Sequence, residues 1–89
     1  MLTREVTVRN RAGVHTRPAS MIVREASRFK AEFFIRKDGY EINGKSIIGV
    51  MTLAAEQGST LDLVFDGPDE TDAANALADL FEQGFGEPI

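Results

Sequence analysis

Two kinds of hydrophobic spacing follow one another along this chain, and their order is the strongest constraint on its fold. Segments typical of strands, either alternating or rich in Phe and Ile, cover residues 3–9, 32–37, 40–43 and 60–65. Apolar residues at helical spacing follow the first, third and fourth of these segments, over residues 16–27, 47–53 and from 70 onward. The predicted order of elements is therefore βαββαβα.

Turn and cap residues mark the boundaries of these segments. Asp38-Gly39 predicts a two-residue type I′ hairpin turn, because Asp and Gly both accept the positive φ that this turn requires. Gly84 and Gly86 are expected to end the last helix, and the tail 87–89 is expected to be loose. The residues predicted to cap the three helices are Thr16, Ser46 and Asp69.

The 89 residues are enough for a single domain spanning residues 1–89. With only four strands, three helices must cover one face of the sheet, so we expect an α+β fold. Its architecture is a two-layer open-faced β-sandwich, whose four-stranded sheet is mostly antiparallel and has helices on one face.

Several classes of protein are disfavoured by composition. No run of about 20 apolar residues predicts membrane insertion, and the charged, alternating residues 1–9 are unlike a signal peptide. The absence of cysteine leaves no disulfide framework and no thiolate metal site. We therefore expect a cytoplasmic protein, and no pattern indicates an obligate dimer, so a monomer is expected.

The charges are divided unevenly along the chain. Residues 1–45 carry ten basic and five acidic side chains, whereas residues 46–89 carry nine acidic and no basic ones, for a net charge of −4. This pattern fits two interpretations. One is a polarised surface that faces solvent; the other is a positive face that meets an acidic protein or a phosphate. Nucleic-acid binding is disfavoured, because the chain is acidic overall and aromatics do not alternate with its basic residues. Five arginines within about 15 residues of the single histidine are Arg9, Arg11, Arg17, Arg24 and Arg28.

That histidine lies in the segment Gly13-Val14-His15-Thr16-Arg17-Pro18-Ala19, between a turn and a predicted helix start. A lone histidine is more often structural than catalytic, but His15 belongs to no apolar stripe, which argues against a core role. A zinc site needs three or four ligands, and the chain has no second His and no Cys. No nucleophile-elbow sequence supports a Ser/His/Asp triad. A nucleophilic histidine is the remaining interpretation.

The neighbours of His15 favour phosphoryl chemistry. A helix N-terminus carries free backbone N–H groups and a partial positive charge, so it binds anions. The Arg17 guanidinium, two residues along the chain, adds charged donors for phosphoryl oxygens. Because a bound phosphoryl group must also leave again, a carrier needs exposed contacts of moderate strength.

On these residues the chain resembles the HPr family, the histidine-containing phosphocarriers of the bacterial phosphoenolpyruvate-dependent sugar phosphotransferase system. The family pattern Gly-x-His-x-Arg-Pro-Ala is met at residues 13–19, and the resemblance extends from Thr3 to about Phe85. It implies that His15 accepts a phosphoryl group on Nδ1 from phosphorylated enzyme I and passes it to a IIA component. Arg17 would bind the phosphoryl oxygens. The protein would be a carrier without a cofactor, not an enzyme.

A second motif, residues 45–53, surrounds Ser46. As a helix N-cap, Ser46 is worth about 1 kcal/mol, which is a sufficient reason for a serine there. The helix after it carries apolar side chains on three sides, so we expect Ile47, Ile48 and Met51 to form an exposed apolar patch, which usually marks a partner site. The segment is similar to the regulatory site of HPr proteins that HPr kinase/phosphorylase phosphorylates. Ile48 and Ala54-Ala55 depart from that group, where Met and Gly are common.

The resemblance leaves more than one role open. A paralogue in the nitrogen-related branch of the system passes phosphate to a regulatory IIA protein, and the motif does not separate the two branches. A regulatory module, which phosphoserine at Ser46 directs to a transcription factor, is a further alternative, although the intact histidine motif argues against it. A hydrolase using Ser and His is remote. The residues expected to contact partner proteins are Thr16, Ser20, Arg24, Ile47, Ile48 and Met51.

Overall fold

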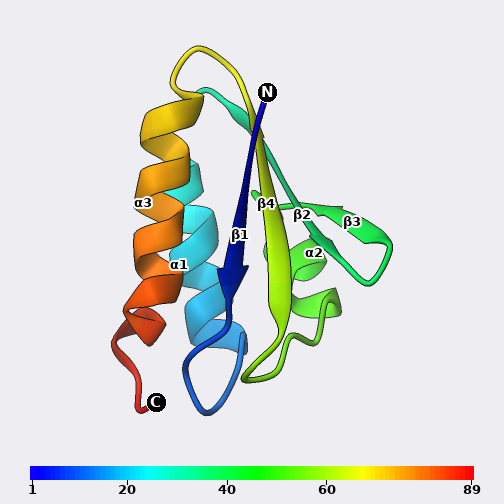
Figure 1. The fold of residues 1–89 in the computed structure, drawn as a ribbon, viewed down its shortest axis with the longest axis vertical. Coiled ribbons are helices and arrows are strands. Elements are labelled where there is room, and N and C mark those ends of the chain that lie inside the picture. The colour runs from blue at the N-terminus through cyan, green and yellow to red at the C-terminus, as the bar shows by residue number, and fades with distance from the viewer.

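The computed structural model describes residues 1–89 and contains the predicted elements in the predicted order (Figure 1). The boundaries differ from the expected ones by one or two residues, as is usual at frayed ends. The strands are β1 (Leu2–Thr7), β2 (Glu32–Lys37), β3 (Tyr40–Asn43) and β4 (Thr60–Asp66). The helices are α1 (Thr16–Ala26), α2 (Ile47–Thr52), α3 (Glu70–Glu82) and a short 3-10 helix, η1 (Gly84–Gly86).

The four strands form one sheet in the order β1-β4-β2-β3, and every neighbouring pair is antiparallel. The β2–β3 hairpin closes at the pair Lys37–Tyr40, with φ of 50° at Asp38 and 84° at Gly39. Two successive positive φ angles are those of a type I′ turn, so the predicted hairpin is confirmed.

The three helices pack on one face of this sheet and share a single core. Each helix contributes a fully buried side chain to the core: Ile22, Val50 and Leu77. From the sheet, Phe33 stacks on Phe65 with ring centroids 4.7 Å apart. The two-layer α+β sandwich is thereby confirmed. None of the helices combines the length and apolarity needed to cross a membrane.

The tail is attached to the body of the protein, contrary to expectation. Phe85, with a φ of 58°, turns its buried ring edge-on to Phe81, and the centroids are 4.9 Å apart. The Arg11 amide donates to the carbonyl oxygen of Pro88 at 2.8 Å. The expectation of a loose tail was wrong because the bond between Arg11 and Pro88 joins residues near opposite ends of the chain, which no local pattern reports.

Only one of the three predicted caps is made as expected. The Ser46 hydroxyl accepts a hydrogen bond from the Gly49 amide at 3.1 Å. Thr16 is instead the first residue of α1, and His15 occupies the N-cap position without a side-chain cap. Asp69 is the N-cap residue of α3, but its carboxylate accepts from the amides of residues 30 and 31, both at 2.8 Å, and so ties down the loop before β2.

Candidate functional site

The loop that precedes His15 is held rigidly against the rest of the protein. Gly13 has a φ of 73°, and a Cβ atom there would lie 2.5 Å from the carbonyl oxygen of Ala55. That same oxygen accepts from the Val14 amide at 2.9 Å. The buried Asn10 side chain donates through Nδ2 to the Gly13 carbonyl at 2.7 Å. Glycine is therefore required two residues before the histidine, because any side chain would separate the two loops.

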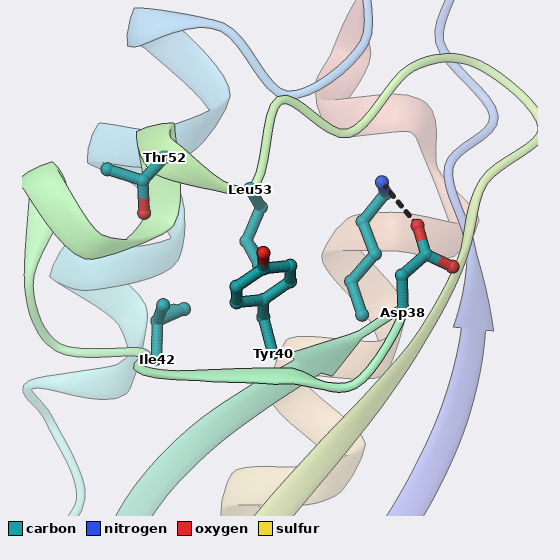
Figure 2. A pocket seen from close by; sticks show the side chains of 6 residues that line it. Asp38, Tyr40, Ile42, Thr52 and Leu53 are labelled. Carbon is teal, nitrogen blue, oxygen red and sulfur yellow. Dashed lines mark hydrogen bonds and ion pairs between the residues drawn. The ribbon is translucent and has the colours of Figure 1, made fainter.

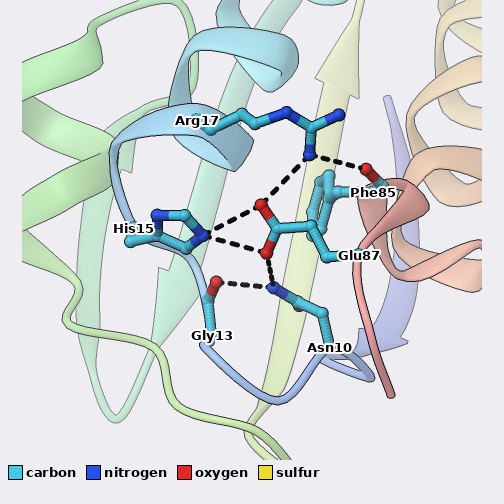
Figure 3. A network of polar contacts seen from close by, with 6 residues as sticks. All are labelled: Asn10, Gly13, His15, Arg17, Phe85 and Glu87. Atoms are coloured by element: carbon cyan, nitrogen blue, oxygen red, sulfur yellow. Dashed lines mark hydrogen bonds and ion pairs between the residues drawn. The ribbon is translucent and has the colours of Figure 1, made fainter.

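His15 projects from this loop at the start of α1, with its side chain 44% exposed. The absence of a core role, expected from its sequence context, is confirmed. Its ring Nε2 lies 2.9 and 3.0 Å from the two carboxylate oxygens of Glu87. Figure 3 shows the other ring nitrogen, Nδ1, on the side of the ring away from that carboxylate, and it makes no hydrogen bond within the protein. Nδ1 is therefore the nitrogen free for chemistry.

Glu87 is the site residue that the sequence analysis missed. Its carboxylate also accepts from Asn10 Nδ2 and from Arg17 Nη1, both at 3.0 Å, and its side chain is only 12% exposed. The hydrogen bond from His15 does most to lower the pKa of Glu87; burial raises it, and the bonds from Asn10 and Arg17 lower it further. A carboxylate held in this way is an ionised acceptor. No signal in the local sequence identifies it, because it belongs to the tail that was expected to be loose.

Arg17 and His15 are brought together through this carboxylate. Arg17 Nη1 donates to Glu87 and to the Phe85 carbonyl, at 3.0 Å each. Its remaining guanidinium nitrogens have no protein acceptor, and the side chain is 57% exposed. The first-turn amides of Thr16 and Arg17 also lack side-chain caps. An anion beside His15 therefore finds several unused donors.

An open hollow of about 610 Å³ adjoins His15 along the exposed side of α1. It brings together the predicted contact residues Thr16, Ser20 and Arg24, although their role in binding stays a prediction. Met21 lines the same hollow and was not predicted. Its spacing of four residues from Arg17 places both on one helix face and could have identified it. The hollow is lined by residues 15, 16, 17, 20, 21 and 24.

The positive charge expected around His15 is smaller than the sequence implies. Arg9 pairs with Glu82 at 2.8 Å, and Arg28 pairs with Glu25 at 2.6 Å. Arg24 remains exposed without an ion pair and points to the hollow beside His15. Arg17 is likewise paired, with Glu87, so the positive face stays a prediction that depends on fewer free arginines than the sequence has.

The second motif lies at the start of α2, which packs against α1. Val50 is fully buried, whereas Ile47, Ile48 and Met51 are 42%, 78% and 42% exposed. Because a helix of one and a half turns presents only one face to a single core, its other apolar side chains must meet solvent or a partner. The predicted exposed apolar patch is thus confirmed as a structural feature.

A different pocket, of about 410 Å³, lies between the β2–β3 hairpin and α2, as Figure 2 shows. Tyr40, Ile42 and Leu53 supply its apolar lining. Its one cation, Lys37, is paired with Asp38 at 2.9 Å, so no free charge is available for an anion. Neither His15 nor Ser46 lines it, and we assign it no part in the chemistry.

Comparison with known proteins shows the family of this chain. A family model described as the phosphorylation site of the PTS HPr component matches residues 2–83. The phosphocarrier protein HPr of Treponema pallidum is 49% identical over 87 residues, which cover 98% of this chain and 99% of that protein.

Two solved structures extend the likeness to the fold. HPr-C-His from Thermoanaerobacter tengcongensis superposes with a TM-score of 0.95 at 39% identity and full coverage of both chains. Crh of Bacillus subtilis, a catabolite-repression protein described as a domain-swapped dimer, has a TM-score of 0.76 at 39% identity. That likeness covers 94% of this chain and 97% of Crh.

Proposed function

The chain belongs to the HPr family of phosphocarrier proteins of the phosphotransferase system, and from this premise we propose that His15 accepts a phosphoryl group from phosphorylated enzyme I and passes it to a IIA component. The observation that carries the proposal is the unbonded Nδ1 of the half-exposed His15 side chain, beside the unused donors of Arg17 and the start of α1. A carrier of this kind is a substrate and then a donor of phosphate, not an enzyme.

The transfer needs only one nucleophilic nitrogen. The Nδ1 lone pair of His15 attacks phosphorus and forms an N–P bond, while the N–P bond of the donor phosphohistidine breaks and returns its electron pair to the donor ring. Arg17 and the first amides of α1 offer hydrogen bonds to the phosphoryl oxygens. The reverse attack by a histidine of the IIA component unloads the carrier.

Exposure of the site suits its successive partners. Because the donor and the acceptor must both reach Nδ1, they use the same face of the protein in turn. We propose that this face combines the hollow beside His15 with the apolar patch of α2, since the two helices pack together. The residues assigned to partner contact are Thr16, Ser20, Arg24, Ile47, Ile48 and Met51.

Ser46 is the proposed regulatory site, phosphorylated from ATP by HPr kinase/phosphorylase. A phosphate on an N-cap serine is compatible with the helix, because the helix dipole favours negative charge there. It would stand next to Ile47 and Ile48 and add charge to an apolar docking surface. Desolvation and repulsion of that charge weaken the docking of enzyme I.

We further propose that the carrier works as a cytoplasmic monomer. A monomer leaves the face around His15 open to both partners. Crh is described as a dimer, so the oligomeric state of this chain needs to be measured. Size-exclusion chromatography with light scattering distinguishes a monomer from a dimer. A dimeric elution at working concentration would overturn the monomer.

The proposed function is tested by intact-mass measurement after incubation with phosphoenolpyruvate and enzyme I of the same host, before and after mild acid. We expect one added phosphate that acid removes and that His15→Ala prevents. A wild-type protein that gains no phosphate would contradict the carrier role.

The second candidate, a regulatory module controlled at Ser46, is favoured by the likeness to Crh. It predicts phosphate gain from ATP and the kinase alone, stable to acid and abolished by Ser46→Ala. Because the carrier proposal also includes Ser46, the two roles are separated by the acid-labile phosphate from enzyme I, which a purely regulatory module does not gain.

A further inference from the structure

Glu87 is the least expected member of the site, and its position has a chemical consequence. We propose that Glu87 is a positioning residue, which keeps the proton of the His15 ring on Nε2 and thereby directs phosphoryl transfer to Nδ1. The inference rests on the proposed carrier function and assigns a role to a side chain that the family motif does not include.

The hydrogen-bond geometry defines the tautomer. An ionised carboxylate can only accept, so a ring nitrogen within 2.9 to 3.0 Å of both its oxygens must carry the proton. A neutral imidazole has one N–H, and with that proton on Nε2 the lone pair lies on Nδ1. Figure 3 shows Nδ1 facing away from the carboxylate.

The same carboxylate also stabilises the product of the attack. When Nδ1 donates its lone pair to phosphorus, the ring keeps the proton on Nε2 and becomes positively charged. The donor's N–P bond breaks at the same time, and its electrons stay with the donor nitrogen, so no proton leaves His15. The negative charge of Glu87 lies where this positive charge develops.

Glu87 is itself fixed in place, as a positioning residue must be. Asn10 donates to Oε1 and Arg17 donates to Oε2, so each carboxylate oxygen has a second donor besides the ring. Asn10 is fully buried and is held in turn by the Gly13 carbonyl. The carboxylate therefore cannot rotate away from His15 without losing several charge-assisted hydrogen bonds.

The first experiment measures the tautomer directly by long-range proton–nitrogen NMR of the His15 ring, at a pH where the ring is neutral. In the wild-type protein we expect the Nε2–H form to dominate. In Glu87→Gln and Glu87→Ala, the Nδ1–H fraction should rise severalfold. Glu82→Gln is the matched control, since it removes the same charge from an exposed glutamate that pairs with Arg9 instead.

The second experiment identifies the phosphorylated nitrogen with phosphoramidate, a small donor that needs no docking. We expect phosphorus NMR to show phosphate on Nδ1 in the wild type and in Glu82→Gln, and a mixture of Nδ1 and Nε2 products in Glu87→Ala. With enzyme I as the donor, Glu87→Gln should be slower by about tenfold or more, because a hydrogen bond to a charged group is lost.

The outcomes separate the two proposals. A wild-type protein that takes no phosphate from enzyme I would overturn the carrier function. A wild-type protein that is phosphorylated, with Glu87→Gln and Glu87→Ala unchanged in tautomer, product and rate, would overturn the role of Glu87 alone. Thermal unfolding of each variant checks that the site is compared in folded protein, and an unchanged tautomer in a folded variant counts against the inference.

Discussion

The first amides of α1 and of α2 both lack acceptors within their helix, but the N-cap side chain supplies one only at α2. At α2 the Ser46 hydroxyl accepts from the Gly49 amide, so the side chain at the N-cap stabilises its own helix. At α1 the N-cap residue is His15, whose ring bonds to Glu87 and leaves the helix without a side-chain cap. Both helices are folded, but only α2 uses its N-cap side chain for stability.

The difference is consistent with the proposed carrier function. Under that proposal, the donors that a cap would satisfy remain free at α1 for the oxygens of the phosphoryl group. The loop and the tail beside the start of α1 are held by distant contacts, chiefly Gly13 against Ala55 and the tail against Arg11. Under the proposed regulation, a phosphate on Ser46 would instead act through its charge on the neighbouring surface.

The largest effect on phosphoryl transfer is expected from a substitution of His15. His15→Ala should abolish phosphoryl acceptance from enzyme I while the fold is kept, because the half-exposed ring does not cap α1. Intact mass and circular dichroism measure the two properties. Residual acid-labile phosphate on the variant would place the acceptor elsewhere.

A smaller loss is expected from Arg17→Lys. Lysine keeps the charge but lacks the planar fork that can hold Glu87 and the Phe85 carbonyl and still present further donors. We expect the rate of transfer from enzyme I to fall about tenfold, as the loss of about 1.4 kcal/mol would give. Rapid-quench kinetics test this, and unchanged rates would mean that Arg17 is only structural.

Ser46→Asp should weaken transfer without weakening the helix. Aspartate caps as well as serine, so the free energy of unfolding should be unchanged within about 0.5 kcal/mol. The added charge beside Ile47 and Ile48 should slow transfer from enzyme I about fivefold, which corresponds to about 1 kcal/mol. Phosphoramidate is the control donor, because a defect in docking leaves its reaction unaltered.

The smallest effect on transfer is expected from Ser46→Ala. In contrast to His15→Ala, this variant should lose stability and keep its function. Loss of the bond to Gly49 should reduce the free energy of unfolding by about 1 kcal/mol in urea titrations. Transfer from enzyme I should continue at the wild-type rate, because the hydroxyl takes no part in it. A slower transfer would show that Ser46 contributes to the docking surface even without phosphate.

Local patterns predicted most of the fold and the two motifs. The alternation of Leu61, Leu63 and Phe65 defined the inner face of β4, and the excess of apolar side chains on α2 defined its exposed patch. Caps were predicted less well. Thr16 and Asp69 are residue types that often cap helices. Thr16 instead lies inside α1, and the Asp69 carboxylate accepts from the amide of residue 30, far from it in sequence.

The order of elements, the single histidine and the arginine beside it follow from the amino-acid sequence alone. Hydrophobic periodicity and residue chemistry are properties of short segments, so they can be read before the chain folds. The place of Glu87 between His15 and Arg17, in contrast, is visible only in the folded chain. Its carboxylate meets His15 and Arg17 across 72 and 70 positions of sequence, and that contact exists because Phe85 is buried against Phe81 and holds the tail over the start of α1.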